Sequence, residues 1–258
     1  MSSLSSCLPF SEIDQFLAPM KGDIACLSDT SFLIALADED HPHHDDAIFL
    51  QEKLADYKVK IFLGVTARSE FIDFHRRCIL TENLMGMLAP SSKWQISASV
   101  RELLKKQQGW IDNQPKQDNA PYLSDSRLKI CKQAFLPRNQ SGQIGWLELC
   151  REYLCGRLAS SWEKIVDIMQ LQYIDMRAED SKELFRKDLL WPEMYRLAEE
   201  SGLGSQDAMI LNLLDASIFS FIVTMDFDLA YGVLASTRDK VALVPDNLYR
   251  NRLKKLKF

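Results

Sequence analysis

Two carboxylates, Asp226 and Asp228, follow directly on a run of buried-strand residues in the stretch "FIVTMDFDLA", which begins at Phe221. An unpaired charge inside an apolar core is strongly unfavourable, and such a group either finds a partner or becomes neutral. The core therefore gives no reason for these acids. Their place at the end of a strand favours a role at the edge of a sheet, where ligands bind.

Three further acids lie where other predicted elements end or begin. Asp29 ends one predicted strand, and Glu70 and Asp207 lie in the first turns of predicted helices. In an open parallel sheet the carboxyl ends of the strands and the starts of the following helices meet at the same edge. We therefore expect Asp29, Glu70, Asp207 and Asp226 to converge in one cleft.

Such a cluster repels itself, and its pKa values rise unless cations neutralise it. Carboxylate oxygens suit Mg²⁺ or Mn²⁺, and a pair of these ions can activate water in phosphodiester cleavage. The predicted catalytic ligands are Asp29, Glu70, Asp207 and Asp226, with Asp228 as a further metal ligand. The number of ions stays open. The alternative is that Asp29 merely caps a helix and that Glu70 and Asp207 favour helix dipoles.

The elements that must position these acids alternate between apolar strands and helices. Strands are predicted at Ile24–Leu27, Val59–Val65, Phe219–Thr224 and 241–245, with a weaker candidate at 171–176. Thr30 and Ser31 are predicted to cap a helix that starts near Phe32, and Thr66 and Ser205 to cap the helices that carry Glu70 and Asp207. This rhythm predicts an α/β fold with a parallel sheet covered by helices on both faces.

The rhythm is interrupted once. We divide the chain into an N-terminal extension (1–22), the first part of the α/β domain (23–80), a mainly helical insertion (81–164), the second part of the α/β domain (165–248) and a basic C-terminal tail (249–258). The insertion contains helical patterns around a polar stretch with two prolines, "NQPKQDNAPYLSDS".

Four motifs carry a resemblance to a known family: "SDTSFLIAL" with Asp29, "VTARSEF" with Glu70, "GLGSQDAMI" with Asp207 and "VTMDFDLA" with Asp226 and Asp228. The chain resembles PIN-domain proteins of the VapC-like ribonuclease group over roughly 23–80 and 165–246. The resemblance implies a three-layer α/β/α, PIN-like (Rossmann-like) fold. It also implies that Thr30, Ser31 and Thr224 are neighbours of the site.

In that family the acids hold Mg²⁺ or Mn²⁺ and the enzyme cleaves RNA, often as the toxin of a toxin–antitoxin pair. The resemblance therefore implies an endoribonuclease with an RNA substrate, an antitoxin partner and a homodimer. The alternative is a non-catalytic PIN scaffold that binds RNA or a protein. A phosphoacceptor receiver domain is disfavoured, because the nearest lysine, Lys240, precedes the last strand instead of following it.

Between residues 81 and 140, nine basic residues face only five acidic ones, in a chain of net charge −5. Trp94, Trp110, Tyr122 and Phe135 are interleaved with these charges. Phosphate contacts with base stacking would bind single-stranded RNA in this way. The favoured alternative is that the aromatic residues form the insertion's own core. The candidates for RNA contacts are Arg68, Arg101, Lys105 and Lys106.

The composition, with 47% hydrophobic and 26% charged residues, is that of a globular protein. The six cysteines include no CxxC pair, which favours a reduced, cytoplasmic chain. No apolar stretch is long enough to predict a membrane helix. His41, His43 and His44 lack partners at zinc spacing, so a surface turn is expected there.

Overall fold

The computed structural model describes residues 6–113, 122–140, 142–174, 182–237 and 239–256. The chain forms two compact units, one of Met1–Phe71 with Ile165–Phe258 and one of Ile72–Lys164. The second unit contains the segment 81–164 that was expected as an insertion, and it begins earlier, at Ile72. The chain passes between the units within two helices, α4 (Val65–Gly86) and α8 (Arg157–Met169).

The first unit contains a sheet in which every neighbouring pair of strands is parallel. Its strands are β1 (Ser6–Pro9), β2 (Ala25–Ser28), β3 (Lys60–Leu63), β4 (Gln172–Tyr173), β5 (Phe221–Val223) and β6 (Val241–Val244). The strand order is β1-β6-β5-β2-β3-β4. Buried apolar residues make up most of β2, β3, β5 and β6, because parallel strands are covered on both faces.

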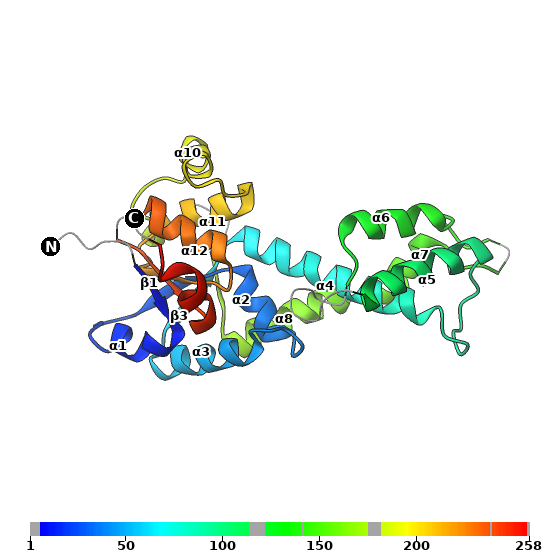
Figure 1. Ribbon diagram of the computed structural model, residues 1–258, viewed down its shortest axis with the longest axis horizontal. Coiled ribbons are helices and arrows are strands. Elements are labelled where there is room, and N and C mark those ends of the chain that lie inside the picture. The colour runs from blue at the N-terminus through cyan, green and yellow to red at the C-terminus, as the bar shows by residue number, and fades with distance from the viewer. Residues whose placement is uncertain (1–5, 114–121, 141, 175–181, 238, 257–258) are drawn as a thin grey trace. The chain divides into compact units, whose positions relative to one another are not determined.

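Helices cover both faces of this sheet. They are α1 (Ile13–Leu17), α2 (Thr30–Ala37), α3 (His44–Asp56), the start of α4, α10 (Trp191–Ser201), α11 (Ser205–Ala216), α12 (Phe227–Ser236) and α13 (Asp246–Leu248). Shorter turns are η1 (Phe10–Glu12), η2 (Lys182–Leu184) and the π-helical η3 (Tyr249–Leu253). In Figure 1, α10, α11 and α12 lie on one side of the sheet and α1 and α3 on the other. The predicted α/β architecture with a parallel sheet is thus confirmed.

One strand was not predicted. β1 lies in the segment 1–22 that was expected as an extension, and it pairs in parallel with β6, Cys7 opposite Ala242. The strand has only four residues, and one of them is Pro9. Proline is compatible with an edge strand, where its missing N–H group is not needed by a neighbour. The weak strand predicted at 171–176 is the two-residue β4, and residues 175 and 176 lie outside the described part.

The core of the first unit joins the sheet to α11 and α12. Leu27 and Ile222 from adjacent strands are buried with Leu211 from α11 and Val233 from α12. This packing holds the strand ends and the helix starts in fixed positions relative to one another. Those ends carry the predicted acids.

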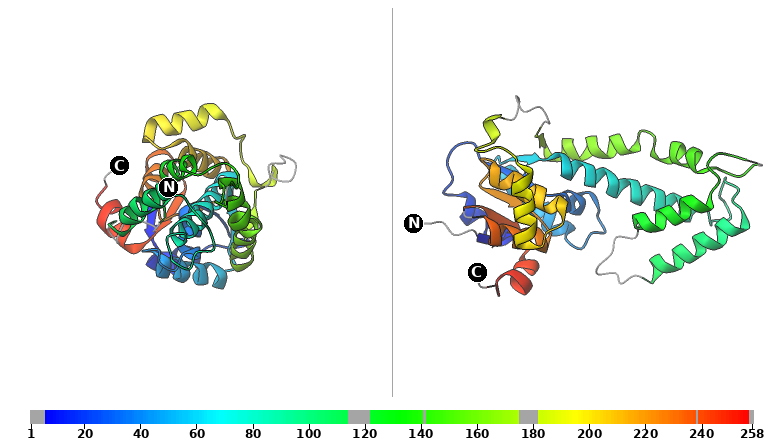
Figure 2. Two further views of the ribbon diagram at one scale, coloured as in Figure 1. Left: turned by 90° about the vertical axis from the view of Figure 1, so that its right-hand side faces the viewer. Right: turned by 90° about the horizontal axis from the view of Figure 1, so that it is seen from above.

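The second unit is helical. It contains the second part of α4, α5 (Ala98–Asp112), α6 (Asp125–Ala134), α7 (Trp146–Leu154) and the first part of α8. In Figure 2 these helices run alongside one another. Their apolar faces form a separate core, in which Phe135 and Trp146 meet edge to face with ring centroids 5.8 Å apart.

The six cysteines are free thiols. Burial raises the pKa of the Cys7 thiol to about 12 and that of the Cys131 thiol to about 11, so these two side chains behave as small apolar groups. None of the helices in the described ranges combines the length and apolar character that a bilayer crossing requires.

Candidate active site

The predicted acids lie where the strand order of the sheet reverses, between β2 and β5. β2 and β5 are neighbours, and from them the chain continues outward on opposite sides, to β3 and to β6. Asp29 follows β2 and Asp226 follows β5, and the Asp29 amide donates a hydrogen bond of 3.0 Å to the Val223 carbonyl. Open α/β sheets bind ligands at such a switch point.

Asp29 caps helix α2 and is only 4% exposed. Its Oδ1 accepts a hydrogen bond of 2.6 Å from the Thr30 amide, and its Oδ2 accepts one of 2.9 Å from the Thr224 hydroxyl. Helix α2 starts at Thr30, two residues earlier than its apolar pattern suggested. The N-cap is therefore Asp29 and not Thr30 or Ser31. The expectation that Asp29 caps a helix is confirmed, and this contact by itself requires no metal.

The three hydroxyls implied as site neighbours all contact the acidic segments. The Ser31 hydroxyl donates to Asp29 Oδ2 and accepts a hydrogen bond of 2.9 Å from the Met225 amide. The Thr224 hydroxyl accepts one of 2.9 Å from the Asp226 amide. The Thr30 hydroxyl donates to Glu70 Oε2. These hydroxyls thus link the end of β2 to the end of β5 and to α4.

Asp226 and Asp228 lie together at the start of α12. Asp226 is its N-cap, and Asp226 Oδ1 accepts hydrogen bonds from the amides of Asp228 at 2.6 Å and Leu229 at 3.4 Å. The Asp228 side chain is exposed. Asp226 therefore has the same double position as Asp29, as a helix cap and as an acid at the sheet edge.

Glu70 and Asp207 are brought to the same edge by α4 and α11, although neither helix starts as predicted. α4 begins at Val65, with the Arg68 amide bonded to the Gly64 carbonyl at 3.3 Å, so Thr66 is not its cap and Glu70 lies in its second turn. α11 has Gly204 as N-cap instead of Ser205. Asp207 lies in its first turn, as predicted.

The carboxyl groups influence one another electrostatically. Burial raises the pKa of Asp207 to about 7, and the charges of Asp226, Asp29, Glu70 and Asp228 add to the rise. Burial also raises the pKa of Glu70 and of Asp29, opposed by hydroxyl hydrogen bonds and reinforced by neighbouring acids. The structure therefore brings the five predicted acids into one negative region.

The side chains do not form a closed cage. No three His, Cys, Asp or Glu side chains in the described ranges are arranged so that they could hold one metal ion together. The reason is visible in the contacts, since Asp29 and Asp226 direct oxygens toward hydroxyls and backbone amides. Mg²⁺ commonly binds through one or two carboxylates and keeps several waters. The chemistry of the donor set, acids that raise each other's pKa, fits such a cation.

The candidate RNA contacts fall in different parts of the molecule. Arg68 is an exposed residue in the first turn of α4, within the first unit. Arg101, Lys105 and Lys106 lie on α5 in the second unit, where Lys105 pairs with Glu102 at 2.8 Å. Lys116, which contributed to the basic count of the insertion, lies outside the described residues.

The aromatic residues of the insertion serve its packing. Phe135 is part of the buried core, and Trp94 and Trp110 pack against that core. Arg127 lies over the Trp110 ring at 3.8 Å and Lys93 over the Trp94 ring at 4.7 Å. Tyr122 meets Phe74 edge to face at 5.1 Å. The alternative of a separate small core is thus confirmed, and the chain's own cations occupy faces that base stacking would need.

The histidines and the lysine considered in the sequence have structural partners. His44 Nδ1 contacts the Ala35 carbonyl at 2.8 Å, and His43 Nδ1 contacts Asp46 at 3.1 Å, so the histidines stabilise the turn before α3. Lys240 is buried, and its ammonium donates to the carbonyls of Ser217 and Phe219 at 2.9 and 2.7 Å. Lys240 precedes β6 and therefore does not lie at the edge of the sheet that carries the acids. It cannot serve as the lysine that a receiver domain needs there.

A cavity that was not predicted adjoins the acids. It has a volume of about 640 Å³ and is lined by Ser28, which precedes Asp29, and by Asn212 of α11. One sequence signal does exist, because Asn212 is a polar residue inside the apolar stretch "AMILNLLDA". The rest of the lining comes from segments that only the fold brings together.

Comparison of the chain with protein-family models, with curated proteins and with solved structures gives no match.

Proposed function

We propose that the protein is a divalent-metal-dependent endoribonuclease with a PIN-like fold. The observation that supports this most is the negative region at the switch point, where burial, together with the charges of carboxyl groups from three other segments, raises the pKa of Asp207 to about 7. Acids kept close together against their own repulsion favour a site for a cation. Phosphodiester hydrolysis is the reaction that such a carboxylate-bound cation supports best.

One or two of the carboxylates of Asp29, Glu70, Asp207 and Asp226 would bind Mg²⁺ or Mn²⁺ directly, and the others would bind through the waters of the cation, with Asp228 at the exposed side. When bound, the cation supplies a water of lowered pKa and positive charge for the phosphate.

The hydroxyls position the acids. Thr224 and Ser31 hold one oxygen of Asp29, and Thr30 holds one oxygen of Glu70. Each bond limits the rotation of a carboxylate, so the carboxylate keeps a defined orientation in the site. This role of Thr30, Ser31 and Thr224 is part of the proposal.

The test is cleavage of a labelled single-stranded RNA with Mn²⁺, Mg²⁺ or EDTA, combined with direct Mn²⁺ binding by electron paramagnetic resonance. Asp29→Asn is expected to lower the cleavage rate by about a hundredfold and to weaken Mn²⁺ binding. Asp40→Asn, the same change at an exposed aspartate, is the matched control. Equal cleavage by wild type and Asp29→Asn would place the activity elsewhere or in a contaminant.

A second candidate, a non-catalytic scaffold that binds RNA or a protein, is favoured by one observation. Asp29 and Asp226 both cap helices, which gives them a structural purpose without any cation. Retained RNA binding without cleavage under any metal would support this candidate.

We also propose a cytoplasmic setting. Six free cysteines suit a reducing, cytoplasmic compartment. A toxin–antitoxin role, an antitoxin protein partner and a homodimer are proposed from the motif resemblance alone. Co-purification of the tagged protein with the product of a neighbouring gene, and light scattering of the pure protein, test these two assemblies.

A further inference from the structure

The last described segment of the chain, residues 246–256, begins at the edge of the sheet that carries the acids. β6 is parallel to β5, with Val223 opposite Leu243, so the chain leaves both strands on the same side of the sheet. Asp226 follows β5 on that side, and α13 and η3 follow β6. Residues 249–258 were expected as a basic tail, but their described part is folded against the first unit.

Apolar side chains anchor this segment. Leu253 is only 3% exposed in the core of the first unit, and Leu248, Tyr249 and Leu256 pack against that core. The Lys254 amide donates a hydrogen bond of 2.8 Å to the Tyr249 carbonyl, which closes the π-helical turn. The fold therefore holds the backbone of the charged residues between these anchors in place.

The exposed residues of the segment are mainly cationic. Arg250, Arg252, Lys254 and Lys255 are exposed, and the segment contains a single acid, Asp246. Arg250 pairs with Asp246 at 2.9 Å. The other three cations form no ion pair within the part of the chain that the structure describes. Three charges thus remain for an external anion.

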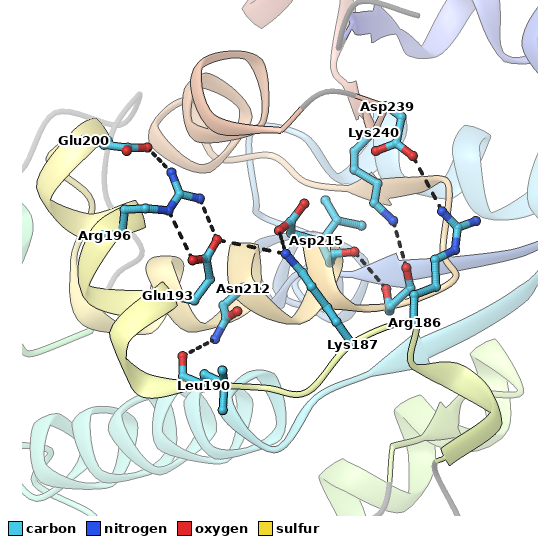
Figure 3. A network of polar contacts seen from close by, with 12 residues as sticks. Arg186, Lys187, Leu190, Glu193, Arg196, Glu200, Asn212, Asp215, Asp239 and Lys240 are labelled. Atoms are coloured by element: carbon cyan, nitrogen blue, oxygen red, sulfur yellow. Dashed lines mark hydrogen bonds and ion pairs between the residues drawn. The ribbon is translucent and has the colours of Figure 1, made fainter.

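The first unit as a whole is acidic, and several of its cations pair with its acids. Its sequence contains 27 Asp and Glu residues against 17 Lys and Arg residues. Figure 3 shows two such pairs, Arg186 with Asp239 at 3.6 Å and Arg196 with Glu193 at 2.6 Å. An acidic unit repels the phosphates of a nucleic acid. A strand bound at its acids therefore needs positive charge beside them.

Arg252 brings such charge to the candidate active site. Its guanidinium carbon lies over the Phe227 ring, 5.5 Å from the ring centre. Phe227 is the first residue of α12 and lies between Asp226 and Asp228 in the sequence. A guanidinium can stack on an aromatic face and still donate to a phosphate. Arg252 thus places donors at the helix turn that carries two of the predicted acids.

We infer that Arg252, supported by Lys254 and Lys255, binds the phosphate backbone of a nucleic-acid strand beside the acids. Guanidinium donors match phosphate oxygens in geometry and charge. Arg252 holds a phosphate next to the scissile one and acts by binding the strand, not in the chemical step. Cleavage of that strand rests on the proposed function, whereas the phosphate binding rests on the charge and the place of this segment.

The test measures binding of a fluorescently labelled single-stranded RNA by anisotropy over a range of salt concentrations, in EDTA so that metal-dependent cleavage is prevented. Arg252→Gln is expected to weaken binding about fivefold at low salt. It should also reduce the slope of log Kd against log salt by about 0.7, the value for one phosphate contact on a single strand. Arg252→Lys keeps the charge and should keep the slope. Arg250→Gln is the matched control, because Arg250 already pairs with Asp246, and it should change both quantities much less.

The lysines give a test that does not depend on the packing of Arg252 on Phe227. The double variant Lys254→Gln/Lys255→Gln should reduce the slope by about 1.4, for two contacts. Lys21→Gln/Lys58→Gln is its control, because these exposed lysines precede β2 and β3 at the opposite edge of the sheet.

Three results would overturn the inference. They are an unchanged slope in Arg252→Gln and in the Lys254/Lys255 variant, an equal change in the two controls, and binding of polyglutamate as tight as that of RNA. The last result would assign the segment to an acidic protein partner.

Cleavage kinetics with Mn²⁺ separate this inference from the proposed function. Arg252→Gln should raise KM about fivefold with little change in kcat, because the contact is the same before and during bond cleavage. Arg252→Lys should restore KM. Cleavage with an unchanged KM in Arg252→Gln overturns the inference while the nuclease stands. RNA binding that depends on Arg252, without any cleavage, leaves the inference standing and removes the nuclease.

Discussion

Asp207 has a carboxyl group that is most stable protonated up to about pH 7, because it is partly buried among other acids. In the unfolded chain the same group loses its proton near pH 4. Its ionisation therefore opposes folding as the pH rises from about 4 to about 7. A bound divalent cation would remove this penalty.

Replacing Asp207 by Asn should reveal the penalty. In EDTA at pH 8, Asp207→Asn is expected to raise the free energy of unfolding by about 1–2 kcal/mol after allowance for solvent screening. Near pH 4 the two proteins should be equally stable, since both carry a neutral group. Urea unfolding at the two pH values, with Asp40→Asn as control, measures this. A stabilisation that is the same at both pH values would contradict the pKa argument.

A bound divalent cation should stabilise the wild type more than Asp207→Asn, because the variant is expected to bind the cation poorly. Saturating Mn²⁺ at pH 8 is expected to raise the melting temperature of the wild type by several degrees through linkage. The rise should shrink below pH 7, because protons then compete for Asp207. Scanning calorimetry measures it, and an unchanged rise in Asp207→Asn would show that the ion binds without this carboxylate.

The hydroxyl of Ser31 is expected to contribute measurably to the stability of the protein. It accepts from the buried Met225 amide and donates to Asp29. Ser31→Ala leaves that amide without its acceptor, so we expect a loss of about 1–2 kcal/mol in the free energy of unfolding. Ser31→Thr, which keeps the hydroxyl, should restore most of it. Denaturant titration of both variants makes the comparison.

At the level of elements, the acidic site was predictable because one topological rule applies to every parallel strand. Asp29 and Asp226 could be placed at one edge from two apolar strands alone. The caps were not predictable in detail. Thr66 and Ser205 have capping side chains, yet Gly64 and Gly204 precede the helices, because the sheet and the helix packing determine where each helix starts.

The cavity could not be predicted from the sequence, because it is formed by contacts between residues that lie far apart along the chain. The Asn212 amide bonds to Leu190 across a distance of 22 residues in sequence. β1 has a similar cause, since its four residues form a strand only through pairing with β6. Long-range pairing of this kind overrides weak local preference.

Lys240 links the start of β6 to the loop between α11 and β5, and the stability contributed by this link can be tested. It is 2% exposed, and its ammonium bonds to two carbonyls of the loop between α11 and β5. Lys240→Met keeps the apolar stem and leaves both carbonyls unpaired, so we expect a loss of about 2–4 kcal/mol. Lys254→Met, at an exposed lysine, should change little. Thermal unfolding of the two variants distinguishes a bridging lysine from a dispensable one.

For the molecule as a whole, the two units have separate cores, so a change within one should leave the other intact. Gly145 lies in the second unit, and a Cβ atom there would come within 2.2 Å of the Arg138 carbonyl carbon. Gly145→Ala is therefore expected to destabilise this unit by about 3 kcal/mol or more. The Mn²⁺-dependent transition of the first unit should not move.

Fluorescence can follow the second unit selectively. Trp94, Trp110, Trp146 and Trp162 belong to the second unit, and only Trp191 belongs to the first. Loss of the tryptophan transition together with the Mn²⁺-sensitive one in Gly145→Ala would show that the two units unfold as one.

The pairing of β1 with β6 has a consequence for the growing polypeptide. Ser6 lies beside Val241, so β1 can take its place in the sheet only after β6, which lies far along the sequence, has been synthesised. Until then the edge of β1 stays open to other chains, and its pairing waits for a contact of long sequence separation. A nascent-chain experiment should therefore find the N-terminal segment protease-sensitive until translation has passed β6.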